Sequence, residues 1–307
     1  MCVLVKKRGG KTGPVKIALI AKPGGEAVIK ELRASVRSLR KAGHQVTPRL
    51  TFDNHDAVRF ARTAVRRQFD LVIAAGGDGT INQVVNGLIG SSARELPRLA
   101  IVPLGTANDF AKGLGIPQTI HEAFDIALHG LPTTIDVADL NGRCFVNVST
   151  GGFGPDITES ASSKAKARFG KLAYLFTAVR KLTELEPARA EFRVDGRVLY
   201  EGPFFFFAVG NARHTGGGTP VTPRADYSDA QLDVVVVTGE KRRDFFSLLP
   251  DLRAGKHPDD ADVLYVQGRD VHVKPFVPIA VNADGEPIRG EEFHYGLRGQ
   301  QITVMRT

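Results

Sequence analysis

Residues 70–80 read Asp-Leu-Val-Ile-Ala-Ala-Gly-Gly-Asp-Gly-Thr, and this stretch decides the fold that we expect. Leu71–Ala75 is a short unbroken apolar run, which is typical of a strand buried on both faces. Three glycines and one carboxylate follow, and Ile81–Ile89 then has the pattern of a helix. A strand that leads through a glycine turn into a helix presents bare backbone N–H groups, which form an anion site, typically for phosphate.

Asp78 is the unusual member of this turn, because a carboxylate repels a bare phosphate. Its presence is explained if a magnesium ion or a ligand hydroxyl lies between the two. We expect the glycines to allow close backbone approach and positive φ angles. The alternative is a tight turn in which Asp78 or Thr80 caps the helix. Three glycines together with an Asp and a Thr favour the phosphate site.

The composition is that of a globular protein with room for two domains: 307 residues, 42% hydrophobic and 24% charged. Cys2 and Cys144 give neither a disulfide framework nor a metal motif, so we expect a cytoplasmic protein. The histidines do not stand at metal-ligand spacing either. No window approaches the ~18 apolar residues of a membrane span. The net charge of +8 suits an anionic partner such as a nucleotide, nucleic acid or acidic lipid head groups. Tryptophan is absent and no aromatic platform is evident, so nucleic acid is not expected.

The first part of the chain alternates strand-like and helix-like segments. We expect strands at 15–20, 44–51, 71–75 and 99–102, and helices at 28–42, 57–69 and 81–90. Short links between alternating elements indicate a parallel sheet covered by helices. Ligands bind beyond the carboxyl ends of such strands, which is where the glycine turn lies.

A second polar glycine turn, Pro103–Phe110, ends the fourth predicted strand. Thr106 can be interpreted as a plain helix N-cap. Two such turns at the ends of two buried strands would face the same crevice, however, and this coincidence favours a functional site.

From about residue 135 the pattern changes to strands separated by turns, which indicates a mostly antiparallel β domain. A helix with an apolar stripe at 172–182 and many basic neighbours interrupts it, and packing in a core is favoured over lying on a membrane. Asn282–Pro287 reads as a hairpin turn with Asp-Gly at its centre. The expected strands are 135–140, 144–149, 191–194, 204–209, 232–238, 271–273, 279–282 and 302–305.

The segments 76–83, 103–111, 145–154 and 282–286, in this order, resemble those of the YegS-like lipid kinases, in the superfamily of diacylglycerol and sphingosine kinases. The match runs from about residue 15 to the C-terminus. It implies an ATP-binding α/β domain at 15–135, a β-rich lipid-substrate domain at 136–297, and an active site in the cleft between them. The last strand, about 298–307, is expected to return to the first domain.

The resemblance also implies site residues. Glu286 matches the proton acceptor that takes the proton of a lipid hydroxyl as it attacks the γ-phosphoryl group of ATP, and Asp78 is the second catalytic candidate, acting through magnesium. An accessory magnesium site, which calcium could also occupy, maps to Asp226, Asp229 and Gln231. The residues expected to bind ATP are Thr51, Gly76, Gly77, Asp78, Gly79, Thr80, Ile81, Asn82, Gln83, Thr106 and Asp109.

This chain departs from the family pattern at three places. Lys22 stands where many members have Asn-Pro, Gln83 replaces the commoner glutamate, and Ser228-Asp229-Ala230 replaces the usual Asp-Gly, which puts the accessory metal site in doubt. The acceptor we expect is a diacylglycerol-like or phosphatidylglycerol-like lipid at a membrane surface. An NAD kinase or other small-molecule kinase and a non-catalytic lipid or nucleotide sensor are the alternatives, and monomer and homodimer both stay open.

Overall fold

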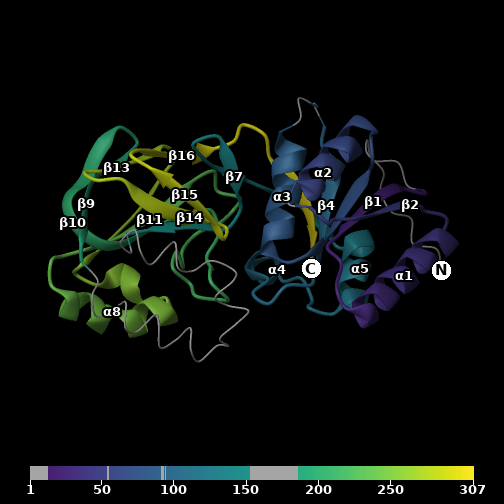
Figure 1. Ribbon diagram of the computed structural model, residues 1–307, viewed down its shortest axis with the longest axis horizontal. Coiled ribbons are helices and arrows are strands. Elements are labelled where there is room, and N and C mark those ends of the chain that lie inside the picture. The colour runs from purple at the N-terminus through teal and green to yellow at the C-terminus, as the bar shows by residue number, and fades with distance from the viewer. Residues whose placement is uncertain (1–12, 54, 91–92, 94, 153–185) are drawn as a thin grey trace. The chain divides into compact units, whose positions relative to one another are not determined.

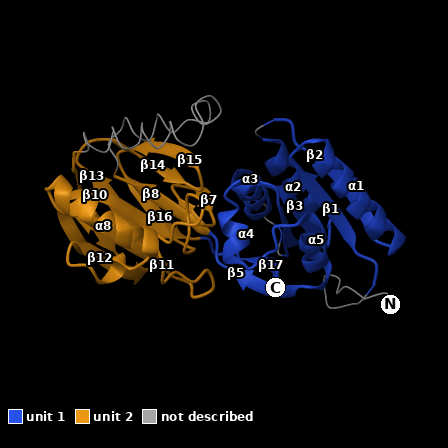
Figure 2. Ribbon diagram, turned by 90° about the horizontal axis from the view of Figure 1, so that it is seen from below, with its two compact units in different colours: residues 1–137, 298–307 blue, residues 138–297 orange. Residues whose placement is uncertain are grey.

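The computed structural model describes residues 13–53, 55–90, 93, 95–152 and 186–307, which form two compact units (Figures 1 and 2). Unit 1 comprises residues 1–137 and 298–307, and unit 2 comprises residues 138–297. The helix predicted at 172–182 lies outside the described residues.

Unit 1 is built on a six-stranded sheet in the order β2-β1-β3-β4-β17-β5. All strands run parallel except β5, which is antiparallel to β17. Every residue of β3 is buried, as its unbroken apolar run predicts. The strands are β1 (Lys16–Ala21), β2 (Gln45–Leu50), β3 (Leu71–Gly76), β4 (Arg98–Pro103), β5 (Leu131–Ile135) and β17 (Ile302–Arg306).

Helices cover both faces of this sheet, which confirms the predicted α/β fold. Helices α2 and α3 lie side by side on one face, and α1 and α5 contact one another on the other (Figure 1). Close packing of the first pair depends on Gly87, where a Cβ would lie 2.6 Å from the Cβ of Ala61. The helices are α1 (Glu26–Lys41), α2 (Asp56–Arg66), α3 (Asp78–Ile89), α4 (Asp109–Gly113) and α5 (Ile120–His129).

Unit 2 is the predicted β-rich domain, and every pairing among its described strands is antiparallel. Its main path runs β15-β14-β8-β10-β9-β13-β16-β6-β7, with β11 pairing β10 and β12. The strands are β6 (Ala138–Leu140), β7 (Arg143–Phe145), β8 (Val148–Gly151), β9 (Ala188–Val194), β10 (Arg197–Gly210), β11 (Leu232–Thr238), β12 (Val263–Gly268), β13 (Val271–Pro275), β14 (Ile279–Ala283), β15 (Glu286–Gly290) and β16 (Phe293–Leu297).

Two apolar clusters hold unit 2 together, and β10 and β11 contribute to both. Alternate residues of a strand point to opposite faces, so Val234 and Val236 enter one cluster while Val235 and Val237 enter the other. The first cluster lies among the strands, and the second packs against helix α8 (Arg242–Ala254).

The expected strand at 135–140 is wrong in one respect, because the chain leaves unit 1 there. β5 ends at Ile135 in the first sheet, and β6 begins at Ala138 in the second. Residues 144–149 likewise divide between β7 and β8. An apolar run predicts that a strand is buried, but it does not predict the sheet to which the strand belongs. The sequence therefore did not reveal where one strand ends and the next begins.

Candidate active site

The strands of unit 1 end together at one edge of the sheet, which places the loops that follow them side by side. Ala21 at the end of β1 pairs with Leu50 of β2 and with Ala75 of β3, and Gly76 pairs with Pro103 of β4. The strand order reverses direction between β1 and β3, and such a reversal is where open α/β sheets bind ligands.

The two glycine turns at this edge are in backbone contact. A Cβ at Gly105 would lie 2.6 Å from the Cα of Gly77, and a Cβ at Gly77 would lie 3.1 Å from the Cα of Gly105. Real Cβ atoms essentially never approach as closely as 2.6 Å, and 3.1 Å is tighter than most real contacts, so a side chain at either position, and above all at Gly105, would push the two turns apart. The two predicted turns therefore lie against each other at one edge of the unit 1 sheet, and the crevice that they would face stays a prediction.

The N-terminus of α3 is open and carries no side-chain cap. Gly77 is its N-cap residue and supplies no side-chain cap, so neither Asp78 nor Thr80 is the N-cap residue of the alternative interpretation. Gly79 is exposed, a Cβ there would meet nothing within 4 Å, and its N–H has no acceptor among the described residues. Bare N–H groups at a helix N-terminus suit an anion.

The expectation of positive φ angles in this loop is wrong. None of Gly76, Gly77 and Gly79 lies in the left-handed region. At Gly76 a Cβ would lie 2.5 Å from the Cβ of Thr80. Close approach and open space explain these glycines, and left-handed backbone does not.

Asp78 joins the two turns. Its Oδ1 accepts a hydrogen bond from the N–H of Phe110 at 3.2 Å, in the first turn of α4. Burial raises the pKa of the Asp78 carboxyl, the nearby charge of Asp109 raises it further, and the N–H groups of Phe110 and Asn108 act in the opposite direction. The charge of Asp78 is thus only partly compensated by protein groups, and a cation beside it would supply the rest.

Asn108 organises the second turn, and the sequence interpretation did not assign it a role. Its backbone is left-handed with φ 52°, which Asn tolerates better than most residues. Its side chain accepts from the N–H of Gly105 at 2.9 Å and donates to the carbonyl of Gly105 and to Gln118, each at 3.0 Å. Asn108, not Thr106, is the N-cap residue of α4, and Thr106 is exposed.

The structure brings the predicted ATP-binding residues to this edge, but two of their side chains turn inward. Thr51 follows β2, and its N–H donates to the carbonyl of Ala21 at 2.9 Å. The side chain of Ile81 is fully buried and that of Asn82 nearly so, so they build the inner face of α3. Gln83 is half-buried.

Glu286 lies in unit 2, directly after the turn of a two-residue hairpin between β14 and β15. Asp284 and Gly285 have φ values of 50° and 91°, which makes the turn type I′ and confirms the predicted hairpin. The buried Asp284 carboxylate accepts from the N–H groups of Val146 at 2.7 Å and Asn147 at 2.9 Å. The exposed Glu286 is thus held on an anchored turn, and its placement opposite the loops of unit 1 stays a prediction.

The predicted accessory metal residues occupy one turn before β11. Asp226 accepts from the N–H and hydroxyl of Ser228 at 2.9 and 2.6 Å. Asp229 accepts from the N–H of Gln231 at 3.0 Å and from the side chain of Gln267 at 3.1 Å. Protein donors already engage both carboxylates, and the accessory metal site stays a prediction.

Family models match both parts of the chain. The diacylglycerol kinase catalytic domain matches residues 16–140, and the YegS C-terminal NAD kinase beta sandwich-like domain matches residues 148–305. The protein named "Probable lipid kinase YegS" of Escherichia fergusonii is 35% identical over 90% of this chain and 91% of its own length. Its namesake in Shigella flexneri is 36% identical over 86% of this chain and 87% of its own.

Solved structures agree with these matches. A diacylglycerol kinase from Bacillus anthracis str. Sterne has a TM-score of 0.79 at 27% identity, covering 97% of this chain and 99% of its own. Yeast NADH kinase shares the fold alone, with a TM-score of 0.56 at 11% identity over 96% of this chain and 84% of its own. No described helix is both long enough and apolar enough to cross a bilayer. The chain belongs to the YegS-like branch of the diacylglycerol kinase catalytic-domain family, which is a family of kinases.

Proposed function

We propose that this protein is an ATP- and Mg²⁺-dependent lipid kinase that transfers the γ-phosphoryl group to the hydroxyl of a diacylglycerol-like or phosphatidylglycerol-like lipid. The observation that carries the proposal is the backbone contact between Gly77 and Gly105, because it brings two glycine turns together beside the uncapped N-terminus of α3. Membership of a kinase family supplies the reaction class.

The nucleotide phosphates would lie against the N-terminus of α3. The Gly79 N–H points out of the helix without an acceptor among the described residues, and the space beside Gly79 is open. Thr51 and Thr106 are exposed or half-exposed at the same edge of the sheet and would complete the pocket. Asp78 fits a magnesium site, because it is a partly buried carboxylate whose charge the protein compensates incompletely. Bound with ATP, the ion would neutralise charge that develops on the phosphate oxygens.

Glu286 would act as the general base. In the reaction the acceptor hydroxyl oxygen forms a bond to the γ-phosphorus, the bond from that phosphorus to the bridging oxygen of ADP breaks, and the hydroxyl proton passes to the Glu286 carboxylate. An exposed carboxylate can receive this proton and release it to water. The anchoring of Asp284 to Val146 and Asn147 holds the turn that carries it.

The turn between β13 and β14 offers a contact for a lipid surface. Phe276 and Val277 are 54% and 63% exposed, an unusual placement for two adjacent apolar residues. The guanidinium of Arg189 lies 6.0 Å from the centre of the Phe276 ring. Apolar side chains beside a cation suit the boundary of an anionic membrane, where a peripheral kinase would meet its acceptor.

The test is a phosphoryl-transfer assay with labelled ATP and an acceptor panel. Purified protein is incubated with and without Mg²⁺ and with vesicles containing diacylglycerol, phosphatidylglycerol or neither. NAD and a soluble diol form separate arms. We expect Mg²⁺-dependent label in one of the two lipids. Label in NAD or the diol without label in lipid would replace the proposal with a small-molecule kinase. Nucleotide binding without transfer to any acceptor would overturn catalysis altogether.

A further inference from the structure

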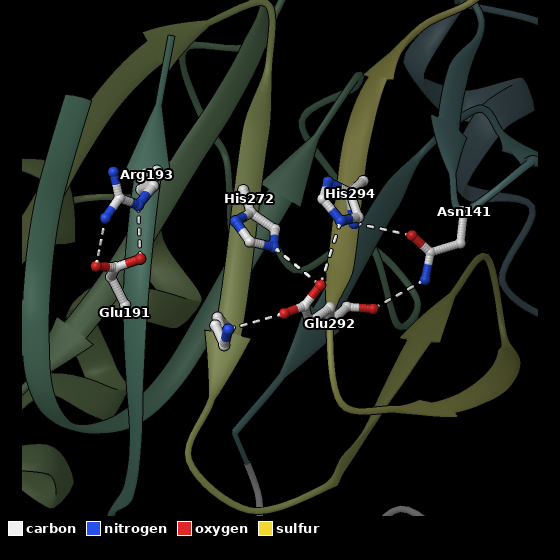
Figure 3. A network of polar contacts seen from close by, with 7 residues as sticks. Asn141, Glu191, Arg193, His272, Glu292 and His294 are labelled. Atoms are coloured by element: carbon white, nitrogen blue, oxygen red, sulfur yellow. Dashed lines mark hydrogen bonds and ion pairs between the residues drawn. The ribbon is translucent and has the colours of Figure 1, made fainter. Parts of the chain in front are cut away.

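The outer face of the unit 2 sheet carries a polar cluster that the kinase site does not use (Figure 3). His272 on β13 pairs directly with His294 on β16, and it pairs with Arg193 of β9 on its other side. Their neighbours Val273 and Phe293 point into the buried core, so the two histidines lie on the solvent side of the sheet. The chain separates them widely, and histidine spacing along the sequence therefore gave no sign of them.

Both imidazoles are directed at one carboxylate. Nε2 of His272 lies 3.9 Å from Oε2 of Glu292, and Nε2 of His294 lies 3.8 Å from the same oxygen (Figure 3). The two rings stack with centroids 4.1 Å apart and planes 13° apart. The three ligand atoms lie within 4.8 Å of one another, and no other group of three or more His, Cys, Asp or Glu side chains among the described residues does so.

A simple ion pair accounts poorly for these distances. Separations of 3.8 and 3.9 Å are too long for hydrogen bonds, and the buried Nε2 of His272 has no hydrogen-bond partner among the described residues. Ligand atoms about 2.0–2.2 Å from a tetrahedral Zn²⁺ stand roughly 3.3–3.5 Å apart. The three atoms are therefore close to metal-ligand spacing, and the two imidazoles would have to turn out of their stack so that the plane of each ring contains the shared ion.

The surroundings hold the three side chains in this arrangement. Asn141 donates to the carbonyl of Glu292 and accepts from the N–H of His294, each at 2.9 Å, which fixes the backbone of both (Figure 3). Lys274 lies 3.0 Å from Oε1 of Glu292, so it engages the oxygen that faces away from the histidines. Outer contacts of this kind orient metal ligands in known sites.

We propose that His272, Glu292 and His294 bind a divalent transition-metal ion, Zn²⁺ in the first instance, with a fourth coordination position open to water. Two imidazoles and one carboxylate select such ions over Mg²⁺ and Ca²⁺, which prefer oxygen ligands. The ion cross-links β13 to β16 and the turn before it, so its binding stabilises unit 2. This site shares no residue with the proposed kinase site and does not depend on the proposed function.

The experiment measures Zn²⁺ binding to the untagged full chain by competition with a chromophoric chelator. The buffer contains about 1 mM Mg²⁺, which would occupy a site that prefers oxygen ligands and leave the proposed site free for Zn²⁺. Wild type is compared with His294→Gln and with His121→Gln, a matched change at an exposed histidine of α5. We expect wild type to bind one Zn²⁺ ion per chain. The affinity of His294→Gln should be weaker by about 10–100-fold or more, since losing even an outer partner of a metal ligand costs that much. The affinity of His121→Gln should not change.

Two further readouts separate a built site from surface binding. Co²⁺ should give the intense visible bands of a tetrahedral site in wild type and lose them in His294→Gln. Zn²⁺ should raise the thermal midpoint of wild type and His121→Gln and not that of His294→Gln. Equal Zn²⁺ affinity in wild type and His294→Gln would overturn the proposal. So would displacement of the bound Zn²⁺ by about 1 mM Mg²⁺, because Mg²⁺ competes for sites made of oxygen ligands.

Discussion

The dipeptide Asp-Gly occurs once in each candidate half of the kinase site, and these two copies have opposite conformations. Asp78-Gly79 forms the first turn of α3, and neither residue has a positive φ. Asp284-Gly285 forms a type I′ hairpin turn in which both residues do. The same two residue types thus provide open space beside a helix terminus in unit 1 and left-handed backbone in unit 2.

The two carboxylates differ as much as the two glycines. Asp284 is buried and accepts hydrogen bonds from the N–H groups of Val146 and Asn147, so it anchors the hairpin. Asp78 accepts from the N–H of Phe110 at 3.2 Å, and burial still raises its pKa. A buried carboxylate whose charge is satisfied by backbone N–H groups has a structural role. A carboxylate whose charge the protein compensates only in part is available to bind a ligand.

The largest effect should come from Glu286, the residue that the unit 2 turn presents. Glu286→Ala removes the proposed base and should lower kcat by roughly 10²–10⁴-fold. Mg·ATP affinity should stay unchanged, because the phosphates are proposed to bind in unit 1. Turnover kinetics and calorimetry measure the two quantities. Glu291→Ala, at an exposed glutamate a few residues on, is the matched control, and an equal loss of kcat in it would refute the assignment.

Asp284 can be compared with Asp195, which begins a hairpin turn of the same conformation with φ 49°. Asp195 is exposed and accepts from the N–H groups of Arg269 and Asp270 at 2.9 and 3.0 Å. An alanine suffers the same backbone strain at both positions. Asp284→Ala, however, leaves two buried N–H groups without acceptors, whereas water replaces the exposed carboxylate. We expect Asp284→Ala to lower the free energy of unfolding, measured with urea, by about 2–4 kcal/mol more than Asp195→Ala does. Equal losses in the two variants would contradict the anchoring role of Asp284.

Asp78→Asn should separate stability from binding in unit 1. The amide oxygen can still accept from Phe110, but the charge is lost, so Mg·ATP affinity should fall by about tenfold or more in calorimetry. Because the fold raises the pKa of Asp78 above its ordinary 3.8, the ionised form costs stability as the pH rises through the folded value. The variant should therefore be more stable than wild type at pH 7, and this advantage should vanish below pH 3.8. A less stable variant at pH 7 would show that the protein compensates the charge after all.

The contrast between the two turns also shows what the sequence could reveal. Apolar runs and glycine turns predicted β1, β3, β4 and the site edge, because these three strands are buried on both faces, whereas the predicted β2 is mostly exposed. The strand β15 (Glu286–Gly290), mostly exposed, and α8, which contains Pro250, carry no such pattern and were missed. Chain separation hid the pairing of His272 with His294, since cross-strand contacts depend on a register that no local pattern encodes.

The smallest effects should come from the two glycines themselves, and they should have opposite signs. Gly285→Ala forces a Cβ into a backbone with φ 91° and should cost about 1–2 kcal/mol. Gly79→Ala adds a Cβ in open space in the first turn of α3 and should be neutral or stabilising by up to about 1 kcal/mol. The ATP affinity should show the reverse order, with the larger loss in Gly79→Ala, because the added Cβ at Gly79 fills the space proposed for phosphate. Urea unfolding and ATP calorimetry on both variants test the pair. Unchanged ATP affinity in Gly79→Ala would mean that the open space beside α3 serves no phosphate.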